Sequence, residues 1–207
     1  DNIKCGNSLI GWDYFEGQLL PSEEEVARIN PFDWKKNFPE VFASGGFHAV
    51  IGNPPYGAEL SKDDENFLQN KYKVAEYQLN TYALFLEKSY DMTKTDGYSG
   101  YIVPSAWVAS NYDKKLRELL VTKTQLMSIL IAPKKTFIDA TVETLILIYW
   151  KKKVKNNYGI QIRRWDKDEK TDYELDTLLI RENEDYIFPV YSTPTEIRII
   201  SKLQESE

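Results

Sequence analysis

Short apolar segments alternate with segments of helical spacing along the first 150 residues, and this alternation constrains the fold more than any other feature. Strands are expected at Phe47–Ile51, Tyr98–Val103, Met127–Ile131 and Thr144–Trp150. Helices, in which apolar residues recur every three or four positions, are expected at Asp63–Tyr72, Asn80–Met92 and Lys114–Val121. Strands that alternate with helices favour a largely parallel α/β sheet.

Three details refine this expectation. The run Phe47–Ile51 is almost entirely apolar, which is typical of a strand covered on both faces. Only 12 residues, without a helical pattern, join Met127–Ile131 to Thr144–Trp150, so these two strands are expected to form an antiparallel hairpin. A further short strand is expected at Ile3–Cys5, ending at Gly6.

Two regions depart from the alternating pattern. Residues 12–44 are rich in aromatic and acidic residues, which indicates an irregular surface excursion with one short helix near Glu24–Ile29. After Lys153 the sequence becomes polar, with a strand-like segment at Gly159–Trp165 and then an acidic tail. A domain boundary is therefore expected near Lys155–Gly159, which divides the chain into residues 1–155 and 156–207.

Composition excludes several classes of protein. The chain has 207 residues, of which 42% are hydrophobic and 28% charged, as in soluble globular proteins. No apolar run approaches the ~20 residues that span a bilayer, and the cytoplasm is the expected compartment. A single cysteine, Cys5, excludes an internal disulfide and is expected to be buried. A single histidine, His48, lies in a strand pattern and is expected to be structural, so no metal site is predicted.

The net charge of −6 argues mildly against a nucleic-acid partner, but a basic groove can coexist with an acidic remainder. One basic stretch is present, and it comprises Lys151, Lys152, Lys153, Lys155, Arg163 and Arg164. The simplest interpretation of this stretch is a solvated strand end and turn.

The first apolar strand stops at Asn53-Pro54-Pro55-Tyr56. Prolines end a sheet ladder, but this does not explain the preceding amide and the following ring. An exocyclic amine such as adenine N6 is a poor nucleophile because its lone pair is shared with the ring. Two acceptors, the Asn53 side-chain oxygen and the Pro54 carbonyl, can hold such an amine, and Pro55 stiffens the loop without adding a donor. Tyr56 can stack on a flat base.

Several stretches of the chain resemble S-adenosylmethionine-dependent DNA adenine-N6 methyltransferases, above all the type IIG restriction–modification enzymes and related phage-defence methylases with the gamma-type order of motifs. The resemblance covers roughly residues 1–153. It is carried by IKCGNSLI at Ile3–Ile10, FHAVIGNPPY at Phe47–Tyr56, YALFLEK at Tyr82–Lys88, GYSGYIVPSAW at Gly97–Trp107 and FIDATVETLILI at Phe137–Ile148. It implies a partial Rossmann-like methyltransferase sheet with a C-terminal antiparallel hairpin.

The resemblance also implies roles for individual residues. Asn53 and Pro54, with Pro55 behind them, would hold the target amine of an adenine flipped out of double-stranded DNA. Tyr56 and Phe137 would sandwich that base. The cofactor would be S-adenosylmethionine, and its contacts are expected at Phe85, Asn7 and the backbone of Ser8.

The chain departs from the family pattern in three ways. His48 stands where an acid is frequent, and Asn7 stands where an aspartate is frequent. No glycine-rich strand-to-helix turn precedes Ile3, and the acid expected for the cofactor's ribose is absent as well. The expectation is therefore a catalytic part at residues 1–155 that lacks the N-terminal cofactor-binding half and is inactive alone. Residues 156–207 are expected to be a linker and the start of a DNA target-recognition region, with no nuclease pattern in the chain.

Two other interpretations remain open at the level of sequence. The same Asn-Pro-Pro-Tyr motif serves enzymes that methylate a glutamine amide in release factors, and some ribosomal-RNA methylases, because both act on a planar, weakly nucleophilic nitrogen. A truncated module that binds DNA or a partner without turnover is the second alternative. The aromatic excursion before Phe47 and the basic segment after Trp150 favour DNA as the substrate.

Overall fold

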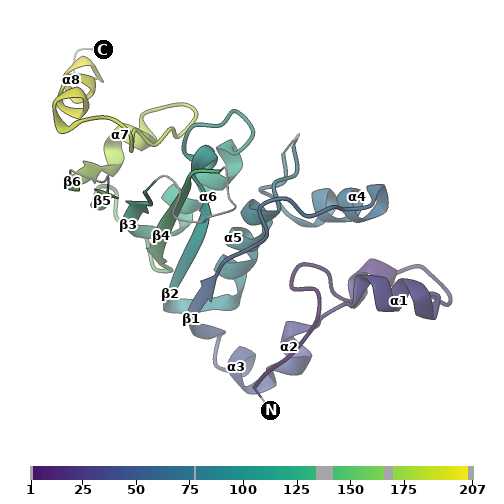
Figure 1. Ribbon diagram of the computed structural model, residues 1–207. Helices are drawn as coiled ribbons and strands as arrows, with labels where there is room; N and C mark the ends of the chain where they lie inside the picture. The colour runs from purple at the N-terminus through teal and green to yellow at the C-terminus, as the bar shows by residue number, and fades with distance from the viewer. Residues whose placement is uncertain (1, 77, 134–141, 166–169, 205–207) are drawn as a thin grey trace.

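The computed structural model describes residues 2–76, 78–133, 142–165 and 170–204, and its centre is one six-stranded mixed sheet (Figure 1). The strand order is β1-β2-β4-β3-β5-β6. The strands are β1 (Phe47–Gly52), β2 (Thr93–Pro104), β3 (Gln125–Ile131), β4 (Thr144–Trp150), β5 (Gly159–Trp165) and β6 (Lys170–Asp176). The expected α/β class is confirmed.

Three of the longer helices fall where the periodicity predicted them, whereas the helix at Pro194–Gln204 was not predicted. The α-helices are α1 (Glu23–Ile29), α2 (Trp34–Asn37), α3 (Pro39–Ala43), α4 (Lys62–Lys71), α5 (Thr81–Met92), α6 (Lys114–Lys123), α7 (Thr177–Arg181) and α8 (Pro194–Gln204). Two 3-10 helices are η1 (Trp12–Phe15) and η2 (Ser105–Val108). Within the described ranges, none of these helices combines the length and the apolar character needed to cross a membrane.

Strand direction defines one edge of the sheet at which four strands end. Strand β1 pairs parallel with β2, and β3 pairs parallel with β5. Strand β4 is antiparallel to both β2 and β3, which confirms the predicted hairpin of β3 and β4. Strands β1, β2, β3 and β5 therefore all run in one direction. Their C-terminal ends lie along one edge, which we call the carboxyl edge.

In the described part of the chain, helices cover one face of this sheet. Helices α5 and α6 pack side by side against β1, β2 and β3, and α7 continues this layer next to β6. Beneath them, Tyr101, Ile129 and Leu147 are buried. On the opposite face Ile51 is 89% exposed. The expectation that Phe47–Ile51 is covered on both faces is thus wrong for the described residues, because the described helices pack against the face opposite Ile51.

The predicted strand at Ile3–Cys5 is also wrong. These residues form a loop, and Ile3 is 86% exposed. The nearest ladder contact is a single bridge between Asn7 and Pro31. Three residues with strand propensity form no ladder unless a neighbouring strand edge receives them. Cys5 is exposed, not buried as predicted, because it belongs to this loop.

The excursion before β1 contains more helix than predicted. Helix α1 confirms the predicted short helix. Helix α2 begins at the N-cap Asp33, whose carboxylate accepts hydrogen bonds from the backbone of Lys35 and Lys36, and α3 begins with Pro39. An aspartate N-cap and a proline at the first helical position both mark helix starts. Each of these helices is, however, too short to show a helical repeat of apolar residues. This segment, purple in Figure 1, extends to one side of the sheet.

The sheet continues past the boundary expected near Lys155–Gly159. Strand β5 pairs with β3 through residues such as Ile162, which lies opposite Ile129. Strand β6 then pairs with β5 along its whole length. The strand predicted at Gly159–Trp165 is confirmed, and the acidic segment after it contains a further strand and two helices.

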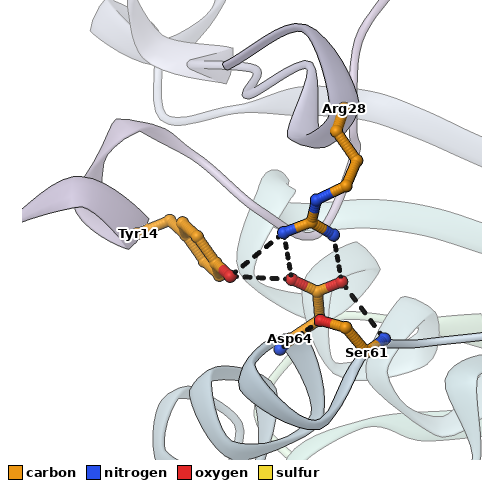
Figure 2. A network of polar contacts seen from close by, with 4 residues as sticks. All are labelled: Tyr14, Arg28, Ser61 and Asp64. Atoms are coloured by element: carbon orange, nitrogen blue, oxygen red, sulfur yellow. Dashed lines mark hydrogen bonds and ion pairs between the residues drawn. The ribbon is translucent and has the colours of Figure 1, made fainter. Parts of the chain in front are cut away.

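An ion pair between the exposed Arg28 and the buried Asp64 connects the excursion to α4 (Figure 2). The Arg28 guanidinium donates to both carboxylate oxygens of Asp64, at 2.7 and 3.2 Å, and the Tyr14 hydroxyl donates to the same carboxylate at 2.8 Å. Asp64 also completes a capping box with Ser61 at the start of α4. Burial alone would raise the pKa of Asp64, but the hydrogen bonds from Arg28, Tyr14 and Ser61 outweigh it and lower the pKa to about 2.

This network makes stability depend on pH in a defined direction. A carboxyl group whose folded-state pKa is depressed stabilises the fold above its unfolded pKa, and that contribution is lost as the pH falls through the folded pKa. For Asp64, a fall from 3.8 to about 2 corresponds to roughly 2 kcal/mol, lost between about pH 4 and pH 2. We expect urea unfolding to show the advantage of the wild type over Asp64→Asn shrinking across that range.

Asp172 provides the matched control. Its carboxylate is more than half exposed and pairs with Arg163 at 3.5 Å. Exposed pairs contribute little, so Asp172→Asn should follow the pH profile of the wild type. Identical pH profiles for the wild type and Asp64→Asn would contradict the role given to the Asp64 network.

Candidate functional site

The Asn53–Tyr56 loop follows β1 at the carboxyl edge, where open α/β sheets bind their ligands. The Asn53 side chain is exposed, Pro54 is buried and Tyr56 is half-buried. Gly52 immediately before the loop is required by close packing, because a Cβ atom there would lie 2.3 Å from the Tyr101 ring. The loop is thus seated on β2 and presents Asn53 to solvent.

One hydrogen bond within the loop bears on its chemistry. The Tyr56 hydroxyl donates to the Asn53 side-chain oxygen at 3.2 Å. Burial raises the pKa of Tyr56, so at neutral pH the phenol keeps the proton that it donates. One of the two lone pairs of the oxygen predicted to accept a substrate amine is therefore already engaged by a donor of the protein itself.

A second hydrogen bond reaches the loop from α5. The Thr81 hydroxyl donates to the Pro55 carbonyl at 2.7 Å, and Thr81 is only 4% exposed. Phe85 lies four residues further along α5 and hence on the same side of the helix. Phe85 is half-buried and packs against the core.

The residues predicted to contact a cofactor at the N-terminus take part in local structure. The Asn7 side-chain oxygen accepts from the backbone N–H groups of Leu9 and Ile10, both at 3.1 Å. The Ser8 carbonyl accepts from the Trp34 indole at 3.1 Å. The Asn7 oxygen thus closes a local turn, and the Ser8 carbonyl binds the start of α2, so a ligand here would meet the Asn7 amide nitrogen instead of its oxygen.

Hydrogen bonds connect this turn to α5. The Tyr72 hydroxyl donates to the Leu9 carbonyl at 2.9 Å. The buried Glu87 carboxylate on α5 then accepts from the backbone of Lys73 and Val74, at 3.2 and 2.9 Å. Helix α5 is therefore in contact with both the Asn53–Tyr56 loop and the segment that secures the Asn7 turn.

Phe137 lies outside the described residues. Of the strands that flank it in sequence, β3 ends at Ile131 and β4 begins at Thr144, both at the carboxyl edge. His48 is exposed on β1. Among the residues that the structure describes, no three His, Cys, Asp or Glu side chains are grouped as a metal site would require.

Sequence reasoning missed the polar cluster behind the loop. Asp113 is 2% exposed and accepts hydrogen bonds from the Asn80 amide, at 3.2 and 3.4 Å, and from the Tyr82 hydroxyl at 3.1 Å. Burial and the nearby Asp113 charge raise the pKa of Tyr82 well above its ordinary value. The polar pair Asn80-Thr81 at a helix start was the available signal, but its partners are 26 to 33 residues away.

Comparison with known proteins gives a consistent result. Residues 2–137 match the family described as Eco57I restriction-modification methylase. The chain is 31% identical over 150 residues to RM.MjaORFECS2P of Methanocaldococcus jannaschii, which is described as a type II restriction enzyme and methyltransferase. It is also 31% identical over 172 residues to the type II restriction enzyme and methyltransferase RM.Eco57I of Escherichia coli.

Coverage of these relatives is unequal. The matches cover 72% and 80% of this chain, but only 12% and 16% of the two relatives. Among solved structures, a protein of Vibrio vulnificus described as the modification subunit of a type I restriction enzyme superposes with a TM-score of 0.54 at 13% identity. That match covers 69% of this chain and 36% of the other, and it shows a shared fold.

Proposed function

Because the chain belongs to the Eco57I restriction-modification methylase family, we propose that it is the catalytic part of an enzyme that methylates the N6 amine of adenine in DNA. The methyl donor is S-adenosylmethionine, and the enzyme acts in a type IIG-like restriction–modification or phage-defence system. The observation that carries this proposal is the exposed Asn53 amide on a two-proline loop at the carboxyl edge.

The loop acts by holding the amine in one orientation. The Asn53 side-chain oxygen and the Pro54 carbonyl accept its two N–H groups, which directs the nitrogen lone pair out of the ring plane. The amine binds to the second lone pair of the Asn53 oxygen beside the Tyr56 hydroxyl, or replaces that hydroxyl at little net cost. The Tyr56 ring then stacks on one face of the flipped base, and Phe137 is proposed for the other face.

S-adenosylmethionine, when bound, supplies an electrophilic methyl group. The partly exposed ring of Phe85 and the amide nitrogen of Asn7 fit contacts to its apolar and adenine parts. Other elements would complete the cofactor site. The open face and edge of β1, with Ile51 89% exposed, are suited to further strands and helices. We assign these elements and the target-recognition region to the complete protein.

The carboxyl edge is the surface proposed to face DNA, and strand direction divides the basic stretch relative to it. Lys151–Lys153 follow β4, which runs backwards, so they lie at the opposite edge. Arg163 and Arg164 lie at the end of β5, on the carboxyl edge. Arg163 pairs with Asp172, whereas Arg164 donates to the Tyr191 carbonyl at 2.9 Å with its guanidinium 5.6 Å from the Tyr191 ring.

Asn53→Ala tests the amine clamp in the complete protein. The clamp acts mainly in the transition state, so methylation should fall by on the order of 100-fold or more while DNA affinity stays nearly unchanged. Transfer of a radiolabelled methyl group to DNA, with adenine N6 identified after digestion, measures this. Methylation of a glutamine peptide or of ribosomal RNA in place of DNA would support the other two enzyme classes. Near-normal DNA methylation by Asn53→Ala would contradict a catalytic role for Asn53.

Tyr56 variants separate the ring from the hydroxyl. Tyr56→Ala should weaken capture of the flipped base by about 1–3 kcal/mol, the range for stacking on an aromatic side chain. Tyr56→Phe keeps the ring and frees the Asn53 oxygen, so capture should be at least as tight as in the wild type. Fluorescence of 2-aminopurine at the target position reports capture. An equal loss in both variants would mean that the hydroxyl, not the ring, binds the base.

Salt dependence tests which edge faces DNA. If Arg164 contacts a phosphate, Arg164→Gln should lower the slope of log affinity against log salt by about 1, while Arg164→Lys should restore it. Glutamine retains a donor for the Tyr191 carbonyl, so the comparison isolates charge. Lys153→Gln, at the opposite edge, is the control and should leave the slope unchanged. A larger change in Lys153→Gln than in Arg164→Gln would reverse the assignment.

A further inference from the structure

We propose that Thr81 is the positioning residue of the catalytic loop, an inference that rests on the proposed function of that loop. Its hydroxyl donates to the Pro55 carbonyl at 2.7 Å from a site only 4% exposed to solvent. Thr81 does not reach the substrate amine in this role. It fixes the backbone between the two acceptors and the Tyr56 ring.

The need for such a donor follows from the two prolines. Neither Pro54 nor Pro55 has an N–H group, so within this pair the loop can be held only through its carbonyls and its packing. The Pro54 carbonyl must remain available for the substrate, which leaves the Pro55 carbonyl as the point of attachment. Within the described part of the chain, Thr81 is the one side chain outside residues 53–56 that hydrogen-bonds to them.

Thr81 is itself held in place on both sides. Its neighbours Asn80 and Tyr82 both donate to the buried Asp113 carboxylate, which immediately precedes α6. A β-branched side chain such as threonine also has few χ1 rotamers. The loop after β1, the start of α5 and the start of α6 therefore form one connected unit, and the Thr81 hydroxyl is the link between the loop and the two helices.

The position of the Pro55 carbonyl governs both functional groups of the loop. The peptide between Pro55 and Tyr56 sets the direction of the Tyr56 side chain, and the Pro54 carbonyl lies one peptide before it. Displacement of a reacting group by about 1 Å can cost on the order of 100-fold in rate. Loss of the Thr81 hydroxyl should therefore reduce turnover more than it reduces DNA binding.

Two variants at Thr81 and one matched control test this inference in the complete protein. Thr81→Val keeps the shape of the side chain without the donor, and Thr81→Ser keeps the donor. Thr124→Val is the control, because Thr124 is fully buried and its hydroxyl donates to the Leu120 carbonyl at 2.6 Å, away from the loop. Both valine variants lose one buried hydrogen bond and should lose similar thermal stability.

Single-turnover methylation at saturating DNA and cofactor is the first measurement. We expect a 10- to 100-fold lower rate in Thr81→Val with DNA affinity within twofold of wild type, a rate close to wild type in Thr81→Ser, and an unchanged rate in Thr124→Val. A wild-type rate in Thr81→Val, or equal losses in both valine variants, would overturn the inference.

Hydrogen exchange across residues 56–60 provides a second measurement that does not depend on activity. Exchange there should accelerate in Thr81→Val and not in Thr124→Val, and an unchanged pattern in Thr81→Val would contradict a positioning role. Hydrogen exchange therefore tests the positioning role of Thr81 separately from the proposed methyltransferase function. If the wild-type protein methylates no DNA, the proposed function fails, and exchange still decides whether Thr81 holds the loop.

Discussion

Two adjacent prolines at the end of β1 impose the constraint on which the candidate site depends. They stiffen the loop but remove the backbone donors with which a loop usually fastens itself. The structure compensates from outside, with Gly52 packed against Tyr101 beneath the loop and the Thr81 hydroxyl behind it. Asn53 can then be exposed and still hold a defined direction, because its support comes from β2 and α5.

The sequence was informative where structure is local and repetitive. Helices α4, α5 and α6 and the hairpin of β3 and β4 followed from periodicity and connection length. The loop at Asn53 was recognisable because two prolines beside an amide and a ring require a special explanation. Helices α2 and α3 were missed because a helix of one turn shows no period, although Asp33 and Pro39 marked their starts.

The failures share a physical cause, which is dependence on distant partners. Composition shows that β1 is apolar, but not which of its faces the described helices cover. A strand such as Ile3–Cys5 forms only where a second strand hydrogen-bonds to it. Because no described strand pairs with it here, Cys5 lies in an exposed loop. The basic stretch is contiguous in sequence, yet β4 and β5 run in opposite directions, so its two parts lie at opposite edges of the sheet. Likewise, nothing local to Thr81 indicates a bond to Pro55.

On the proposed function, the hydrogen bond from the Tyr56 hydroxyl to Asn53 would give the loop a preference among ligands. A small amine that lacks a ring would share the Asn53 oxygen with the phenol or displace it, and would gain no stacking on Tyr56. A flat ring without an amine can stack on Tyr56, but it leaves the phenol bound to Asn53. Only a molecule with both an amine and a flat ring would hydrogen-bond to Asn53 and also stack on Tyr56. On the proposed function, the loop would therefore favour a ligand that combines an amine with a flat ring over water or a free amine, because the Asn53 oxygen is already partly engaged by Tyr56.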